Sequence, residues 1–285
     1  MKRILRLFGL GTLLATLSGC FQVSTVVRVN QDGSGTIEER MLVSKKLVAQ
    51  LNEFMHAFAE EGTEPPKPME LFEPEKLRQA AKGMGEEVSF TGAKKLDTDE
   101  FEGYAAEYAF ADINRLRLNQ KSSPPLPSAK TEDKSPALMF SFTKGTKGNP
   151  ATLVVRQQDA QAASPAPNTA PPATASSPEQ AAKPGATPAD PQIKALEDMF
   201  NGLRISMAVE VNGTITKTNA TYHDASRVTV IDLDWERLSG ASDKLAGLGA
   251  SGGDISVAEA RKILKDIPGI KVDLNDELRV EFTGK

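Results

Sequence analysis

The sequence is poor in the residues that crosslink chains or bind metal ions. Its 285 residues include one cysteine, two histidines and one tryptophan. A single cysteine cannot form a disulfide within the chain, and one cysteine with two histidines falls short of a zinc-binding cluster. No apolar run near the C-terminus approaches the roughly 20 residues that a membrane-spanning helix needs. The chain must therefore fold around an ordinary hydrophobic core.

Residues 157–192 lack every large apolar side chain. This stretch contains no Leu, Ile, Val, Phe, Tyr or Trp, and it holds eight of the 18 prolines among Ala, Ser and Thr. Such a segment buries too little apolar surface to offset the entropy of ordering. The composition predicts a disordered, Pro/Ala-rich linker. We expect residues 20–156 and 193–285 on either side of it to form two parts of one domain.

The first twenty residues have the three-part form of a secretory signal peptide. Lys2, Arg3 and Arg6 precede a short apolar run, and small residues follow it. That run is too short to span a bilayer, so residues 1–19 are expected to be removed. Removal takes away three positive charges and no negative ones, so the net charge of −4 becomes −7. An acidic chain argues against nucleic acid as a partner.

Leu17-Ser18-Gly19-Cys20 resembles the lipobox of bacterial lipoproteins. The resemblance implies cleavage between Gly19 and Cys20, an S-diacylglycerol on Cys20, and an N-acyl chain such as palmitate. Phe21 stands where aspartate marks retention at the inner membrane, which implies the outer membrane, facing the periplasm. Because the first strand is expected to begin at Val23, the folded body should lie within roughly 10 Å of the membrane surface.

Hydrophobic periodicity predicts an α+β domain with an antiparallel, hairpin-rich sheet and packed helices. Strands are expected at residues 23–29, 36–43, 88–90, 104–110, 138–142, 152–156, 203–211, 214–222, 227–233, 270–272 and 278–282. Helices are expected at 47–58, from Pro74 to Met84, and at 193–201, 235–245 and 256–265. Asp32-Gly33 and Asn212-Gly213 are typical of hairpin turns, and Ser44 is typical of a helix N-cap.

The sequence around the first turn imitates a calcium-binding loop. Asn30, Asp32, Gly33 and Glu39 match positions 3, 5, 6 and 12 of an EF-hand, but Arg28 occupies the first ligand position. An arginine there repels calcium, so no metal site is predicted.

The sequence around each of the two histidines favours a structural role over a metal-binding or catalytic one. His56 lies beside the apolar face of its helix, with no ligand partner at the right spacing. His223-Asp224 lies in a turn without the serine elbow that a catalytic triad needs.

Residues 247–252 match GxGxxG but lack a preceding strand, which favours a loop. No activated nucleophile is evident. We therefore expect no catalytic residues, no cofactor and no enzymatic activity, and a hydrolase is the least favoured alternative.

Three stretches resemble an LppM-type lipoprotein domain, a family of bacterial envelope proteins without an assigned activity. They are VSTVVRVNQDGSGTIE at residues 23–38, YAFADINRL at 108–116, and the segment 211–235. The resemblance implies an α+β domain that binds lipid or another amphiphile in an apolar cavity.

The expected function is that of a non-enzymatic, lipid-anchored envelope lipoprotein. Its partners would be the membrane and either a bound amphiphile or another envelope protein. The alternative is a structural or assembly factor that docks on an envelope protein, since hairpin strands offer edges for strand addition.

Overall fold

The computed structural model describes residues 21–57, 70–119, 137–146, 149–158, 202–239 and 257–284. Most of these residues are in strands, which form two sheets. The larger sheet has seven strands, in the spatial order β11 (Ile270–Val272), β10 (Arg227–Asp234), β8 (Arg204–Val211), β1 (Phe21–Val29), β2 (Gly35–Ser44), β4 (Phe101–Phe110) and β3 (Val88–Asp97). The smaller sheet has the order β5 (Arg117–Asn119), β6 (Ala137–Thr143), β7 (Ala151–Gln158), β12 (Glu277–Gly284) and β9 (Gly213–Thr218).

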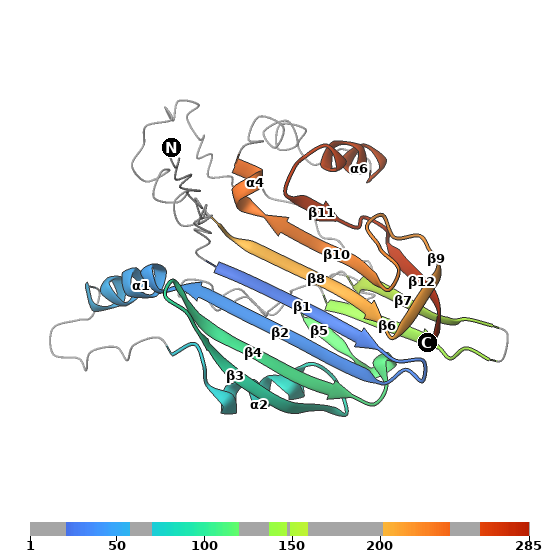
Figure 1. Ribbon diagram of the computed structural model, residues 1–285, viewed down its shortest axis with the longest axis horizontal. Coiled ribbons are helices and arrows are strands. Elements are labelled where there is room, and N and C mark those ends of the chain that lie inside the picture. The colour runs from blue at the N-terminus through green and yellow to red at the C-terminus, as the bar shows by residue number, and fades with distance from the viewer. Residues whose placement is uncertain are drawn as a thin grey trace, which may run out of the picture.

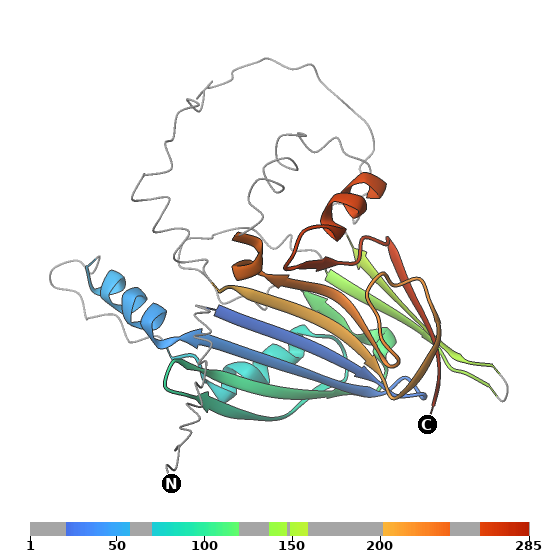
Figure 2. The same cartoon turned by 45° about the horizontal axis from the view of Figure 1, so that its top comes forward.

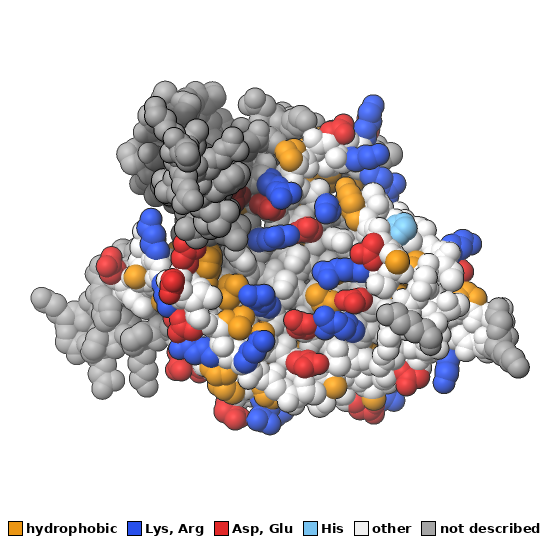
Figure 3. Space-filling model, in the orientation of Figure 1, with side chains coloured by type: hydrophobic (Ala, Val, Ile, Leu, Met, Phe, Trp, Pro, Cys, Tyr) orange, Lys and Arg blue, Asp and Glu red, His pale blue; other side chains and the backbone are white. Residues whose placement is uncertain are grey.

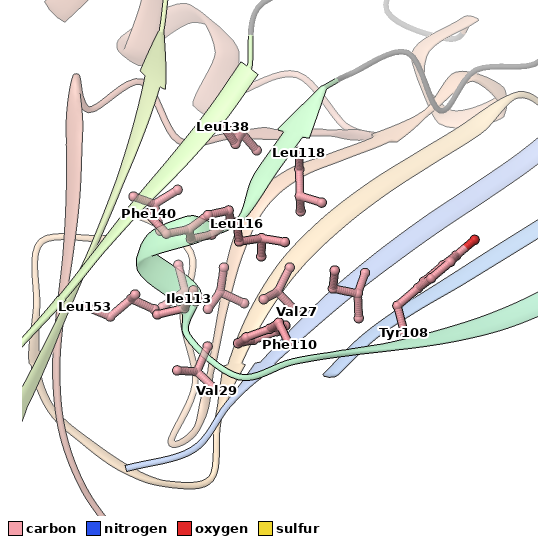
Figure 4. Close-up of a cluster of buried hydrophobic side chains, with 14 of the residues drawn as sticks. Val27, Val29, Tyr108, Phe110, Ile113, Leu116, Leu118, Leu138, Phe140 and Leu153 are labelled. Carbon is pink, nitrogen blue, oxygen red and sulfur yellow. The ribbon is translucent and has the colours of Figure 1, made fainter. Parts of the chain in front are cut away.

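The smaller sheet packs on one face of the larger sheet, toward the end where β1 and β8 finish (Figures 1 and 2). Side chains from both sheets meet in one apolar core. Figure 4 shows part of it, where Val27 and Val29 of β1 face Phe140 of β6 and Leu153 of β7. Each of these four side chains is at most 5% exposed. Their burial follows from the alternation of inward and outward residues along each strand.

Helices are few in the described residues. They are α1 (Lys45–Ala57), α2 (Pro74–Gly83), α4 (Trp235–Ser239), α6 (Val257–Lys265) and the 3₁₀ turn η1 (Ile113–Arg115). None of the described helices combines the length and apolar character that crossing a membrane requires. The predicted α+β class is thus supported in its antiparallel hairpins, while the structure as described is mostly β.

The expected helix starts are confirmed at Ser44 and Pro74. The Leu47 backbone N–H donates to Ser44 Oγ at 3.2 Å, which caps α1. Pro74 opens α2, where its missing N–H costs nothing. Leu77 and Ala81 of α2 are buried and form its inner face, whereas Ala80 is exposed.

The hairpin at Asp32-Gly33 is confirmed, although its turn is wider than the two residues expected. Val29 pairs with Gly35, and the loop between them is closed by the Asn30 N–H, which donates to the Ser34 carbonyl at 2.8 Å. Within this loop, Gly33 is the one residue with a positive φ, of 91°. Strand β1 also begins at Phe21, two residues before the expected start at Val23.

The expected hairpin at Asn212-Gly213 is wrong. Strand β8 lies between β1 and β10 in the larger sheet, whereas β9 pairs with β12 in the smaller sheet. Asn212 therefore marks the point where the chain crosses between sheets. A Cβ at Gly213 would lie 2.0 Å from the Thr283 carbonyl oxygen. Close approach of β12, rather than turn geometry, explains the glycine.

The residues after 202 supply central strands to both sheets. Strand β8 pairs in parallel with β1, with Val23 opposite Ile205, and β12 pairs with β7. Strands β11 and β12, expected as two closing strands, belong to different sheets. Strand β7 reaches Gln158, two residues into the range predicted as linker. Residues 159–192, the signal peptide and the expected helix at 193–201 lie outside the described residues.

Candidate functional site

One carboxyl group is buried in the core. Glu39 is only 6% exposed, and the inward positions on either side of it in β2 hold Ile37 and Met41. A charged side chain in such surroundings loses its hydration, which makes burial of an unpaired carboxylate costly. Among the described residues, none of the ion pairs includes Glu39.

Two tyrosines of the neighbouring strand flank this carboxyl group. Glu39 is paired with Ala106 of β4, so Tyr104 and Tyr108 lie two residues away on the same face. The Tyr104 hydroxyl donates to Glu39 Oε1 at 2.6 Å. We call Glu39, Tyr104 and Tyr108 the Glu39 cluster.

The Tyr108 hydroxyl has no hydrogen-bond partner among the described residues. The side chain is 0% exposed, and its ring packs edge-on against Phe90, with 5.8 Å between the ring centroids. In Figure 4 the hydroxyl points away from the apolar cluster that the ring adjoins. A buried hydroxyl without a partner is uncommon and costs stability, so this group is a candidate for contact with a ligand.

Small side chains surround Glu39 along the sheet. The positions in register with it on the neighbouring strands are Thr25 on β1, Ala106 on β4 and Ala93 on β3. Larger residues occupy the adjacent inward rows, where Ile37 pairs with Tyr108 and Met41 pairs with Tyr104. The Glu39 cluster is therefore a buried polar group within an inner face that is mostly small or apolar over the described strands β1, β2 and β4, with the Thr25 hydroxyl beside it in register.

Burial governs the protonation of the cluster. It raises the pKa of Glu39, and the hydrogen bond from Tyr104 opposes that rise. Burial, followed by the nearby Glu39, raises the pKa of Tyr104 and of Tyr108 far above the ordinary tyrosine value. Both tyrosines therefore keep their protons at neutral pH. The cluster offers two hydroxyl groups and a carboxyl group that is biased toward its neutral form.

Two surface pockets of the described residues differ from this interior site. One has a volume of about 340 Å³ and lies at the end of the larger sheet beside Arg28, Glu210 and Asn212. The other has a volume of about 520 Å³ and lies on the smaller sheet beside Lys217, Asn219, Glu277 and Arg279. Arg28 is already paired with Glu38 at 2.8 Å and Glu210 at 3.6 Å. Figure 3 shows the outward face of the larger sheet, which is covered by interspersed charges of both signs. Such a mixture of charges is typical of a solvated surface.

Those residues singled out from the sequence that the structure describes do not assemble into a site. Gly19 and Cys20 lie outside the described residues, as does the side chain of His56. Asp224 accepts from the backbone N–H groups of Ser226 and Arg227, so it holds a turn beside His223. Asp32 likewise accepts from Ser34. In the described part of the chain, no group of three His, Cys, Asp or Glu could hold a metal ion.

Sequence reasoning did not identify the Glu39 cluster. In the sequence, Glu39 was noted only because it matches position 12 of an EF-hand loop. In the structure it lies on the inner face of β2, away from the turn at Asp32-Gly33. A signal was present, because Glu39 interrupts the inward alternation of Ile37, Met41 and Val43. A carboxyl group at an inward strand position needs a partner, and Tyr104 and Tyr108 alternate in the same way on the strand beside it.

No family model matches the chain, and no curated protein matches it. A solved structure similar to it is the folded domain of the LppM protein of Mycobacterium tuberculosis. The TM-score is 0.30 at 11% sequence identity, and the alignment covers 93% of this chain and 91% of that one. This likeness is distant, and the LppM-type resemblance stays a prediction from the sequence. The chemistry of this chain has to be argued from its own residues.

Proposed function

We propose that this protein is a non-enzymatic envelope lipoprotein that holds the polar group of an amphiphile at the Glu39 cluster. The sequence supports the anchor, since Lys2, Arg3, the apolar run and Ser18-Gly19-Cys20 occur in the order of a lipoprotein signal. In this proposal the acylated Cys20 holds the protein on the outer membrane, facing the periplasm. Three acyl chains make release negligible, because each buried methylene contributes about 0.8 kcal/mol.

The unpartnered Tyr108 hydroxyl is the observation that carries the binding proposal. A buried hydroxyl that lacks a partner destabilises a protein by about 1–3 kcal/mol. This cost is recovered when a ligand supplies the missing acceptor or donor. The surrounding apolar face suits the hydrocarbon part of an amphiphile, because such sites combine apolar walls with a few fixed polar groups.

The protonation of the cluster favours a neutral polar group. A hydroxyl, ester or amide can accept from Tyr108 and exchange a hydrogen bond with the Glu39 carboxyl group. An anionic group buried here would find no described cation beside Glu39 to offset its loss of hydration. The proposed ligand class is therefore an amphiphile with an uncharged head.

Mass spectrometry of lipids extracted from the purified full-length protein tests this proposal. We expect a neutral amphiphile in stoichiometric amount. The Ala106→Leu variant should lose it, because Ala106 is buried directly opposite Glu39. Ala105→Leu is the matched control, since Ala105 lies on the other face of β4 and is half-buried. Absence of bound lipid from the wild type, or equal loss from both variants, would contradict the site.

The alternative function, docking on another envelope protein, has one structural observation in its favour. Strand β3 is ten residues long and lies at the edge of the larger sheet, where one side of its backbone is free of strand pairing with the described residues. Such an edge can accept a strand from a partner. Crosslinking in cells from Lys94 of β3 should then capture one stoichiometric partner, and recovery of uncrosslinked monomer alone would argue against it.

A further inference from the structure

Three apolar residues lie close together at the end of the larger sheet where β1 begins. Gln22 pairs with Arg204, which places Phe21 and Leu203 at the same level. Asp234 also pairs with Arg204, and the Trp235 N–H donates to the Leu203 carbonyl at 2.9 Å. Phe21, Leu203 and Trp235 thus follow one another across adjacent chain segments, and each is half-buried. Phe21 packs in part against the main core and Trp235 against Leu238 and Ile267, so only the remaining part of each side chain is accessible. We call these three residues the Trp235 corner.

Charge distinguishes the Trp235 corner from the turn between β3 and β4, which lies at the same end of the larger sheet. The two arginines at the corner are balanced, since Arg204 lies 3.6 Å from Asp232 and Arg237 lies 3.4 Å from Asp234. The turn between β3 and β4 instead carries Asp97, Asp99, Glu100 and Glu102, of which Asp97 is paired with Lys45 at 2.7 Å. A bilayer that contains anionic lipid repels this acidic turn but not the corner.

The anchor joins the chain at the same place. Cys20 is bonded directly to Phe21, and β1 begins at Phe21 without an intervening spacer. One residue spans at most about 3.6 Å, so an acylated Cys20 holds Phe21 at the membrane surface. Tryptophan is the side chain most typical of that interface, because it combines a large apolar ring with a polar N–H.

We propose that the Trp235 corner inserts into the interfacial region of the membrane, with the acidic turn tilted away from the lipid. The strands then run outward from the membrane. Strand β1 is nine residues long, which corresponds to roughly 30 Å at about 3.3 Å per residue. The Asn30–Ser34 loop and the C-terminus lie at the opposite end of the sheet and face the periplasm in this arrangement (Figures 1 and 2). This inference rests on the proposed acylation of Cys20.

Tryptophan fluorescence tests the proposal directly, because Trp235 is the only tryptophan of the chain. The lipidated full-length protein is reconstituted into vesicles of phosphatidylethanolamine and phosphatidylglycerol, with and without brominated acyl chains. We expect brominated lipid to lower Trp235 emission at least about twofold, since a ring at an interfacial depth of roughly 5–10 Å can contact the bromines.

A relocated tryptophan provides the matched control. The double variant Trp235→Phe, Tyr222→Trp places the reporter between β9 and β10, at the end of the sheet away from Cys20. Its emission should not respond to brominated lipid. Leu203→Glu should reduce the quenching of Trp235 while the protein still floats with the vesicles, because a carboxylate opposes insertion.

Flotation separates the two proposals. If the chain does not float and Cys20 carries no acyl group, both the anchor and the docked orientation are overturned. If the chain floats but brominated lipid leaves Trp235 emission unchanged, the anchor stands and the docked orientation is wrong. Quenching of Trp235 without quenching of the Tyr222→Trp reporter supports the orientation.

Discussion

The Tyr104 hydroxyl donates a 2.6 Å hydrogen bond to Glu39 Oε1 across two neighbouring strands, and both side chains are buried. This contact joins the second strand of one hairpin to the second strand of the next. It satisfies one oxygen of a carboxyl group that the core would otherwise exclude. The Tyr108 hydroxyl, two residues from Ala106 on the other side, has no such partner among the described residues.

Tyr104→Phe should destabilise the protein by about 1–3 kcal/mol, because it leaves a buried carboxyl group without its donor. Chemical denaturation in urea measures the change. Tyr108→Phe is the control on the same strand and the same face, and it should cause no loss. Equal destabilisation by the two variants would show that the Tyr104–Glu39 bond contributes nothing beyond packing.

Stability should depend on pH through Glu39. Burial raises the pKa of the folded protein's Glu39 above its ordinary value of 4.5. Between the pKa of the unfolded state and the raised pKa of the folded state, the folded protein binds more protons than the unfolded chain. The contribution of Glu39 to stability is therefore full below the pKa of the unfolded state, and it is lost as pH rises through the pKa of the folded state. Denaturation at several pH values measures this dependence, and Glu39→Gln should remove it. A contribution that grows with rising pH would contradict the assignment.

Local sequence signals predicted the first two hairpins. Valine alternation and Asp32-Gly33 specify β1 and β2, and the apolar alternation at residues 88–90 and 104–110 marks parts of β3 and β4. Ser44 and Pro74 marked helix starts because capping depends on neighbouring residues only. These features are decided within a few residues of the chain.

The remaining pairings depend on contacts that are distant in sequence. The local sequence at Asn212-Gly213 is the same whether the flanking strands pair with each other in a hairpin or enter different sheets. The position of β12 beside Gly213 decides that they enter different sheets. The parallel pairing of β1 with β8 leaves no local signal either. The Glu39–Tyr104 bond was missed for the same reason, since the two residues are 65 positions apart.

Gly33→Ala should destabilise the fold by about 1–2 kcal/mol, because a side chain opposes the left-handed backbone that this loop requires. Gly33 has a φ of 91°, and an added Cβ would lie 2.8 Å from Phe142 of the smaller sheet. Thermal denaturation provides the measurement. Gly92→Ala is the matched control, since nothing lies within 4 Å of the position that a Cβ at Gly92 would take. This variant should change stability by no more than about 0.5 kcal/mol.

Cleavage between residues 159 and 201 should leave the two pieces associated. The C-terminal piece holds β8 and β12, which pair with β1 and β7 of the N-terminal piece. A protease site engineered into residues 165–185 would give a nicked protein that elutes as one species in size-exclusion chromatography without denaturant. Separation of the pieces under native conditions would mean that these pairings do not hold the fold together.

The central claim is that the Glu39 cluster binds a ligand and is not only a core contact, and Tyr108→Phe tests it most directly. Removing a buried hydroxyl that has no partner should stabilise the ligand-free protein, while the affinity for the amphiphile recovered from the wild type should fall about five- to tenfold, as expected for one lost hydrogen bond. Calorimetric titration of both proteins, with their unfolding free energies, gives the comparison. Higher stability with weaker binding is the predicted result, whereas unchanged affinity would contradict the account.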